Sequence, residues 1–144
     1  MSVPVACIFP HSEFKDEAEL QDWLNHELFE EEKGRYLLRK IRFRDKDFIN
    51  RIIPGSLVLF RKGRNVVGEG ITSTPIKVLN PPINSVTEDG IPMTYYNEVY
   101  FEKICSYIMP ITIIEQWLNR ILRPRYYLIL SERSVFEKAF PSRC

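Results

Sequence analysis

Basic side chains gather in three short stretches of the sequence, at 39–46, 61–64 and 120–125. Lysine and arginine contact the phosphates of nucleic acid when they stand on loops or on the open face of a strand. The alternative is a solvated surface that nearby acidic residues neutralise. We expect at least one stretch to contact phosphate. The candidates are Arg39, Arg42, Arg44, Arg61, Lys62, Arg64, Arg123 and Arg125.

Aromatic and small polar side chains in the second half of the sequence could bind a base. Stacking on an aromatic ring contributes ~1–3 kcal/mol per base, and hydroxyl or amide groups can hydrogen-bond to the base edge. Tyr95 and Tyr96 are adjacent in a predicted strand, so they point to opposite faces and only one can line a given pocket. The candidates for a base pocket are Thr72, Ser73, Tyr95, Tyr96, Asn97 and Trp117.

Several of these candidates also have a structural interpretation. Trp117 falls on the apolar stripe of a predicted helix, where core packing is favoured. Thr72 and Ser73 could instead end a strand before Pro75. Asn97 could satisfy a turn.

Side chains suited to catalysis are few. Of two histidines, His11 follows a predicted strand and is the only plausible general base of its type, while His26 is expected to be exposed on a helix. No nucleophile elbow, phosphate loop or zinc-protease motif occurs. Glu69 could be a catalytic carboxylate, but a strand residue paired with an arginine is the favoured interpretation. We therefore expect a binding domain with no catalytic residues of its own.

The three cysteines, Cys7, Cys105 and Cys144, lie far apart in the sequence. Because no two are within a few residues, their spacing fits no metal motif, and neither a metal nor a cofactor is expected. We interpret them as reduced thiols of a cytoplasmic protein. Cys7 and Cys105 stand in apolar strand-like runs, and Cys144 is expected to be exposed.

Length and charge fit one ordinary domain over residues 1–144. Hydrophobic residues make up 44% of the 144, enough for a packed core. The net charge is +1, so nucleic-acid binding would have to rest on local clusters of charge. No apolar run approaches the ~20 residues that span a bilayer, and no membrane partner is expected. The ending at 141–144 would suit a domain cut from a longer protein.

Helix and strand signals do not alternate regularly, which favours an α+β fold over a doubly wound sheet. The clearest signal is a hairpin of strands at 56–60 and 66–71, whose paired glycines suggest the bends of a small mixed β-barrel flanked by about three helices. The proline-rich segment 79–94 is predicted to be a long loop. Other strands are predicted at 3–9, 36–43, 95–108 and 126–130, and helical segments at 16–33, 47–52, 112–121 and 131–140. Capping boxes that begin at Asp16 and Thr112 predict two of the helix starts, and Ser131 or Ser134 is expected to cap the last helix.

Three blocks resemble, in order, the EVE and YTH branches of the PUA-like superfamily. IPGSLVLFRKGRNVVGEGITSTPIKV, at 53–78, resembles the central hairpin of that branch. NEVYFEKICSYIMPITIIEQWLN, at 97–119, resembles the strand and helix that come next. RYYLILSERSVFEKAF, at 125–140, resembles the closing strand and helix.

This resemblance implies a PUA-like barrel that binds a base of DNA or RNA. YTH domains hold a methylated adenine in an aromatic cage, and EVE-like domains are associated with modified nucleic acid, including as recognition parts of McrBC-type restriction systems. The expected partner is therefore nucleic acid with a modified, flipped base, together with a fused or separate ATPase or nuclease. The more distant ASCH branch implies an RNA-binding protein or a small nucleoside or RNA hydrolase as the alternative. A protein-interaction module is a third interpretation, which the small net charge favours.

Overall fold

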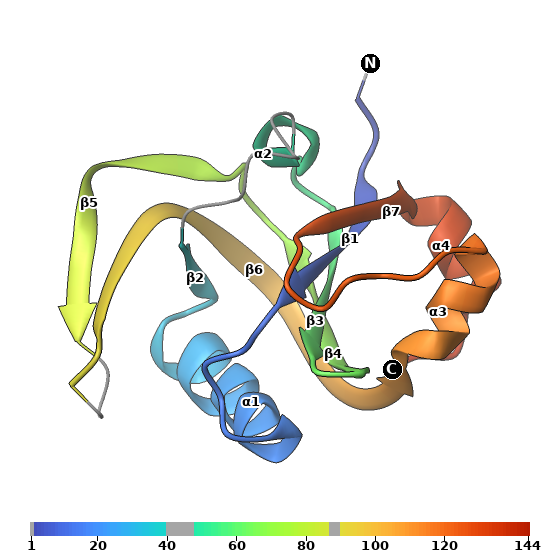
Figure 1. The fold of residues 1–144 in the computed structure, drawn as a ribbon. Coiled ribbons are helices and arrows are strands. Elements are labelled where there is room, and N and C mark those ends of the chain that lie inside the picture. Colours follow the sequence, from blue (N-terminus) through green and yellow to red (C-terminus); the bar gives the residue numbers. More distant parts are fainter. Residues whose placement is uncertain (1, 40–47, 87–89) are drawn as a thin grey trace.

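Seven strands and four α-helices make up the described part of the chain, which in this computed structural model is residues 2–39, 48–86 and 90–144 (Figure 1). The elements in chain order are β1 (Val5–Pro10), α1 (Glu17–Asp22), the π-helix η1 (Trp23–Glu31), β2 (Arg35–Leu38), α2 (Phe48–Arg51), β3 (Leu57–Lys62), β4 (Asn65–Thr72), β5 (Lys77–Val86), β6 (Pro92–Pro110), α3 (Ile111–Leu118), β7 (Leu128–Glu132) and α4 (Arg133–Ala139).

All seven strands belong to one mixed sheet in the order β2-β6-β4-β3-β1-β7, and β5 also pairs with β6. Strands β1 and β3 are parallel, and the other pairs are antiparallel. The α+β class is confirmed, but the predicted closed barrel is wrong. Closure needs pairing between the two end strands, and in the described ranges β2 pairs only with β6 and β7 only with β1. The hairpin glycines indicated local bends and carried no information about these distant ends.

The predicted central hairpin is confirmed as β3 and β4, with Gly63 at a φ of 60° in the turn. A bulge between Phe60 and Arg61 shifts the register of the pair. At Gly68 an added β-carbon would lie 2.6 Å from the carbonyl oxygen of Cys105 in β6. This glycine therefore permits close approach of the two backbones, which a larger residue would prevent.

Strands β1 and β3 lie at the centre of the molecule and are buried on both faces, as parallel strands commonly are. In β1, Cys7 and Phe9 face one hydrophobic core, and Ala6 and Ile8 face the other. The first core lies under α1 and η1, and the second lies under α3 and α4 (Figure 1). The helices contribute Leu20, Leu24 and Leu28 to the first core and Ile111, Ile114 and Phe136 to the second.

The loop predicted over 79–94 is largely strand, which corrects that expectation. Strand β5 pairs with the first half of β6, and the two form an arm at the left of Figure 1. Pro81 and Pro82 lack amide hydrogens, and both lie where the register shifts between Val78 and Ile83. The prolines therefore interrupt the ladder without preventing the strand.

The helix starts were only partly predicted. Asp16 caps α1 as expected, because its carboxylate accepts a hydrogen bond of 2.9 Å from the Glu19 amide. The capping box predicted at Thr112 is wrong, since α3 begins at Ile111 after Pro110 and has no side-chain cap. Helix α4 likewise follows Glu132 with no side-chain cap, so neither predicted serine fills that role.

None of the helices in the described part of the chain has the length and apolar character needed to span a membrane. The first part of the strand predicted over 36–43 is present as β2. Two phosphate candidates follow it in the sequence. Arg42 and Arg44 lie outside the described residues.

Candidate functional site

A cleft of about 360 Å³ opens between the C-terminal end of β1, strand β2, the start of β6 and the segment before β7. Three of the predicted site residues line it, although they come from distant parts of the chain: Arg39, Tyr95 and Arg125. Two further tyrosines and one carboxylate also line it: Tyr36, Tyr127 and Glu13. We call this the tyrosine cleft.

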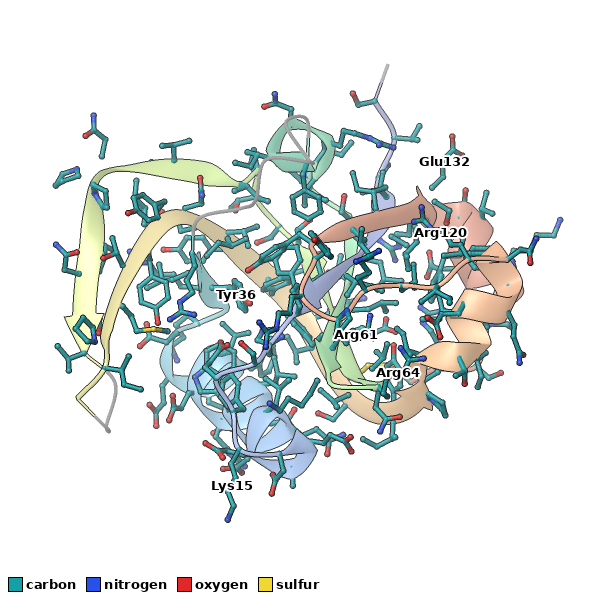
Figure 2. All side chains as sticks on the ribbon, viewed as in Figure 1. Lys15, Tyr36, Arg61, Arg64, Arg120 and Glu132 are labelled. Atoms are coloured by element: carbon teal, nitrogen blue, oxygen red, sulfur yellow. A yellow bond between two sulfur atoms is a disulfide. The ribbon has the colours of Figure 1, made fainter. Side chains whose placement is uncertain are left out.

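The tyrosine rings are held by the first hydrophobic core. Tyr36 lies on the inward face of β2, and its ring centroid is 5.7 Å from that of Phe101 (Figure 2). The Tyr127 ring packs 5.1 Å from Phe9. Burial raises the pKa of the Tyr36, Tyr95 and Tyr127 hydroxyls above the ordinary value, so all three remain protonated at neutral pH. The cleft therefore offers aromatic faces and neutral hydroxyl donors.

Charges of both signs meet in the tyrosine cleft. Arg39 and Arg125 are exposed at its edge, and the Arg39 guanidinium contacts the Met93 sulfur. Burial is the main reason why the pKa of Tyr95 is raised. The Glu13 carboxylate raises this pKa further, and the Arg39 guanidinium lowers it. Glu13 and Arg39 line the same cavity as the Tyr95 ring. An anionic group of a ligand could bind Arg39 and Arg125, while a hydrogen-bond donor of the same ligand binds the Glu13 carboxylate.

His11, the candidate general base, lies behind the cleft rather than in it. Its ring is buried, and Nε2 is 2.7 Å from the Tyr36 hydroxyl. Burial lowers the pKa of His11 below its ordinary value, although Glu13 and the backbone of Arg61 and Phe9 oppose the shift. The ring is therefore neutral at neutral pH and supports Tyr36. His26, in contrast, is exposed as predicted.

We expect His11→Gln to reduce the loss of stability on acidification. The unfolded chain binds a proton at His11 near pH 6.5, whereas the folded protein, with its lowered pKa, resists protonation. The contribution of His11 to the free energy of unfolding is thus fully present above about pH 6.5. It falls as the pH drops below that value, by at most about 1.4 kcal/mol per pH unit. Urea denaturation of both proteins from about pH 7 to about pH 5 measures the difference. If the free energies of unfolding of the two proteins fell in parallel with pH, His11 would be protonated equally in the folded and unfolded states.

Arg61 was predicted to reach phosphate from the hairpin tip, and the structure corrects this placement. Strand β3 extends to Lys62, and the bulge before Arg61 turns its side chain inward, leaving 1% exposed. Its Nε donates to the Gly63 carbonyl at 2.8 Å, and Nη1 donates to the Leu122 carbonyl at 3.0 Å. Arg61 therefore fixes the chain that leads to Arg125 and Tyr127.

The other basic candidates differ in accessibility. Arg64 forms an ion pair of 2.6 Å with Glu115 and lies away from Tyr36 in Figure 2. The Lys62 ammonium donates to the Ser12 carbonyl at 3.3 Å, at the edge of the cleft. Arg123 is exposed, two residues from Arg125. Arg39, Lys62, Arg123 and Arg125 are thus available near the cleft.

Most of the remaining base-pocket candidates have structural roles, which corrects their assignment. The Thr72 hydroxyl donates to the Ile53 carbonyl at 3.0 Å, and the Ser73 hydroxyl donates to the Tyr100 carbonyl at 3.2 Å. Trp117 packs edge-on against Phe136 at 5.7 Å in the second core. Each therefore lies outside the tyrosine cleft.

Two neighbours of Tyr95 are also outside the cleft. Asn97 is buried in β6, where it pairs with Leu38 of β2 and Val78 of β5. Tyr96 is 40% exposed and points to the opposite face from Tyr95. The expectation that only one of the adjacent tyrosines lines a pocket agrees with this placement.

Sequence reasoning missed Tyr36, Tyr127 and Glu13 as residues of the site. A local signal was present for Tyr127, since it stands two residues after the phosphate candidate Arg125. Tyr36 similarly stands three residues before the basic stretch at 39–46. Glu13 carries no such signal, because its proximity to the tyrosines depends on the fold.

Glu69 and the cysteines form a separate group. The predicted pairing of Glu69 with an arginine is confirmed, because Arg143 Nε lies 2.5 Å from its carboxylate. The prediction of three reduced thiols is wrong, since a disulfide joins Cys105 and Cys144. Cys7 is a free, buried cysteine, and burial raises its pKa.

In comparisons with known proteins, no protein-family model matches the chain, and no curated protein matches it in sequence.

Proposed function

We propose that this chain binds nucleic acid and that the tyrosine cleft receives one base. The observation that carries the proposal is the meeting of Arg39, Tyr95 and Arg125, three residues selected from sequence for phosphate contact and stacking, around one cavity. Its volume of about 360 Å³ falls in the range of about 300–1,000 Å³ typical of small-ligand pockets. Aromatic walls with arginines at the edge suit a planar base attached to a phosphate backbone.

A base can enter the cleft only from a single strand or after flipping out of a duplex. In the proposed complex the arginines bind the flanking phosphates, and Tyr95 stacks on the base. Recognition of a modified base, and a partner ATPase or nuclease as in restriction systems, remain proposals that the EVE-like and YTH-like sequence blocks support. Glu69, the carboxylate on which the hydrolase alternative depends, is held by Arg143 outside the cleft.

Tyr95→Ala is expected to weaken oligonucleotide binding by about 5- to 150-fold, because one stacked base contributes about 1–3 kcal/mol. Fluorescence anisotropy with labelled single-stranded DNA and RNA, and with duplexes that carry or lack base methylation, measures the affinity. Tyr96→Ala is the matched control, since this neighbouring ring faces away from the cleft, and it should retain wild-type affinity. Equal weakening by both variants, or no binding by the wild type, would contradict the proposal.

The salt dependence tests the arginines independently. Each phosphate contact contributes about −0.7 to the slope of log K against log salt for a single strand. Arg125→Ala should therefore make the slope shallower by about that amount. Arg120→Ala, an exposed arginine beside α3 and away from the cleft in Figure 2, should leave it unchanged.

A further inference from the structure

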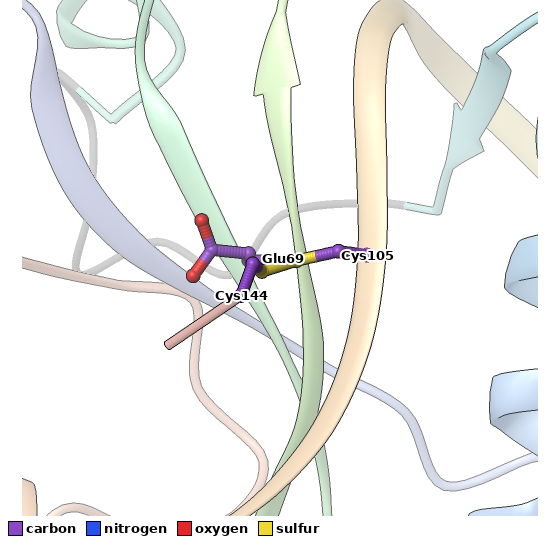
Figure 3. Close-up of side chains that lie close together, drawn as sticks. All are labelled: Glu69, Cys105 and Cys144. Atoms are coloured by element: carbon purple, nitrogen blue, oxygen red, sulfur yellow. A yellow bond between two sulfur atoms is a disulfide. The ribbon is translucent and has the colours of Figure 1, made fainter. Parts of the chain in front are cut away.

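A second group of reactive side chains lies outside the tyrosine cleft. Glu69 in β4 and Cys105 in β6 are direct partners in an antiparallel ladder, so their side chains share one face of the sheet. Cys144 reaches the same place from the C-terminal segment (Figure 3). One carboxylate oxygen and the two sulfur atoms lie within 4.8 Å of one another.

The Glu69 carboxylate is already oriented by its neighbours. Oε1 accepts hydrogen bonds from Arg143 Nε at 2.5 Å and from the Tyr107 hydroxyl at 2.8 Å, while Oε2 accepts only a longer one of 3.2 Å from Arg143. The carboxylate therefore keeps acceptor capacity that these contacts do not use. Hydrogen bonds of this kind typically orient carboxylates that ligate metals.

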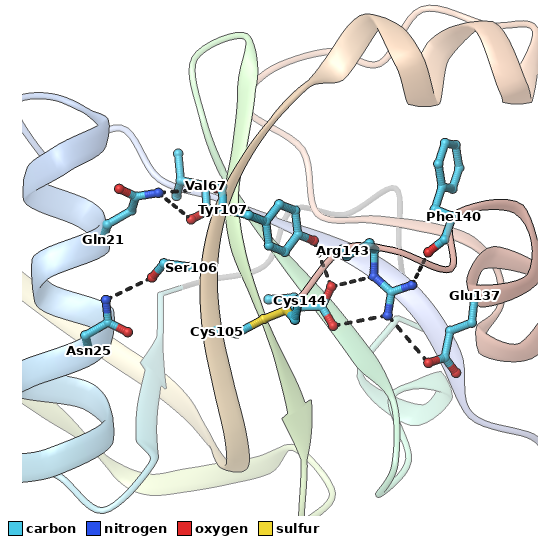
Figure 4. Close-up of a disulfide and its surroundings, with 11 residues drawn as sticks. Gln21, Asn25, Val67, Cys105, Ser106, Tyr107, Glu137, Phe140, Arg143 and Cys144 are labelled. Carbon is cyan, nitrogen blue, oxygen red and sulfur yellow. Dashed lines mark hydrogen bonds and ion pairs between the residues drawn. A yellow bond between two sulfur atoms is a disulfide. The ribbon is translucent and has the colours of Figure 1, made fainter.

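Arg143 also fixes the chain beside Cys144. Its guanidinium donates to the Phe140 carbonyl and lies 3.5 Å from the Glu137 carboxylate (Figure 4). The side chain is only 9% exposed, although it is one residue from Cys144. These contacts hold the terminal segment against β4 and β6 independently of the disulfide.

A pocket of about 400 Å³ adjoins this group and is lined by Glu69, Cys105 and Cys144 together. It provides an entry path and room for a further ligand such as water. Lys103 and Arg133 also line it, so positive charges lie close to the negative ligands of a bound metal.

We propose that, when the disulfide is reduced, Cys105, Cys144 and Glu69 bind Zn²⁺, with water as the fourth ligand. Thiolate and carboxylate ligands suit zinc, which accepts tetrahedral sites of mixed sulfur and oxygen donors. With Zn–S distances of about 2.3 Å, two sulfurs on a tetrahedral zinc are roughly 3.8 Å apart. Rotation of the exposed Cys144 side chain allows this separation.

The disulfide and the zinc site exclude each other, because both use the same two sulfur atoms. Two small-molecule thiols reduce the disulfide and are oxidised to a disulfide of their own, while Cys105 and Cys144 take up two electrons and two protons. Binding of Zn²⁺ as a dithiolate complex then releases those two protons. Spacing along the chain gave no hint of this site, since the two cysteines are 39 positions apart in the sequence and the third ligand lies on another strand.

The test uses the full chain, reduced with a phosphine under nitrogen and titrated with Zn²⁺ against a chromophoric chelator. We expect one Zn²⁺ per reduced chain and none per oxidised chain. Substitution of Co²⁺ should give thiolate-to-metal charge-transfer bands and the intense visible bands of tetrahedral cobalt. Zinc binding by the oxidised chain, or its absence from the reduced chain, would overturn the proposal.

Variants identify the ligands. Cys144→Ser alters an exposed terminal residue, so the fold should persist by circular dichroism while zinc affinity falls at least 100-fold. Cys7→Ala is the matched control, because that thiol is buried in the first core, and it should keep wild-type affinity. Glu69→Gln should weaken binding at least tenfold and shift the cobalt bands. Equal affinity in Cys144→Ser and wild type, or an unchanged cobalt spectrum in Glu69→Gln, would show that the assigned ligands are wrong.

Discussion

Gly34→Ala is expected to lower the free energy of unfolding by about 3 kcal/mol, combining the cost of a left-handed alanine with that of overpacking. Gly34 has a φ of 86°, and an added β-carbon would overlap the carbonyl oxygen of Phe101. Its amide donates to the Leu28 carbonyl at 2.7 Å, and its carbonyl accepts from the Phe101 amide at 2.8 Å. Gly34 therefore lies between η1 and β2 in a backbone contact that has no room for a side chain.

Urea denaturation followed by tryptophan fluorescence measures this loss. Gly63→Ala is the matched control, since Gly63 also has a positive φ, of 60°, but no atom within 4 Å of an added β-carbon. That variant should lose only about 1 kcal/mol, the cost of the left-handed backbone alone. Similar losses at the two positions would show that the contact with Phe101 relaxes without cost.

Arg61→Met is expected to lower the free energy of unfolding by about 2–3 kcal/mol and to weaken ligand binding as well. Methionine fills much of the same volume but cannot donate to the buried Leu122 carbonyl or to the Arg123 carbonyl, 3.4 Å from the guanidinium. These bonds anchor the segment that carries Arg125 and Tyr127 into the tyrosine cleft. Arg61 is thus a positioning residue that touches no proposed ligand.

Two measurements separate this effect from simple destabilisation. Hydrogen exchange should accelerate at residues 119–127 under native conditions, and oligonucleotide affinity should fall while the protein remains folded. Arg120→Met is the matched control, because that arginine is exposed in the same segment and its replacement should change the free energy of unfolding by less than about 0.5 kcal/mol. Wild-type exchange at 119–127 in Arg61→Met would contradict the anchoring role.

Local patterns predicted the elements whose signals are complete within a few residues. The hairpin of β3 and β4 is defined by Gly63 and by two apolar runs, and both strands are present. The first helix is defined by the Asp16 cap and an apolar stripe. Strand β5 was missed because Pro81 and Pro82 favour a loop locally, while pairing with a strand later in the chain decides the outcome.

The site shows the same division between local and distant causes. Tyr95 could be chosen from alternation within β6, because side-chain direction in a strand is a local property. The burial of Arg61 could not be predicted, since it depends on the chain segment that packs against it. The packing of Trp117 against Phe140, in contrast, agrees with its place on a helical apolar stripe. The pairing of Cys105 with Cys144 likewise follows from the path of the terminal segment over the sheet.

The central place of β1 has a consequence for synthesis on the ribosome. This strand is the first to emerge, yet it lies between β3 and β7, whose partner residues are 57–61 and 128–132. Until those residues have been translated, one or both hydrogen-bonding edges of an apolar segment stay open to other chains. The pairing of β1 is therefore complete only after residues 128–132 have left the ribosome, and nascent chains halted before residue 128 should depend most on chaperones.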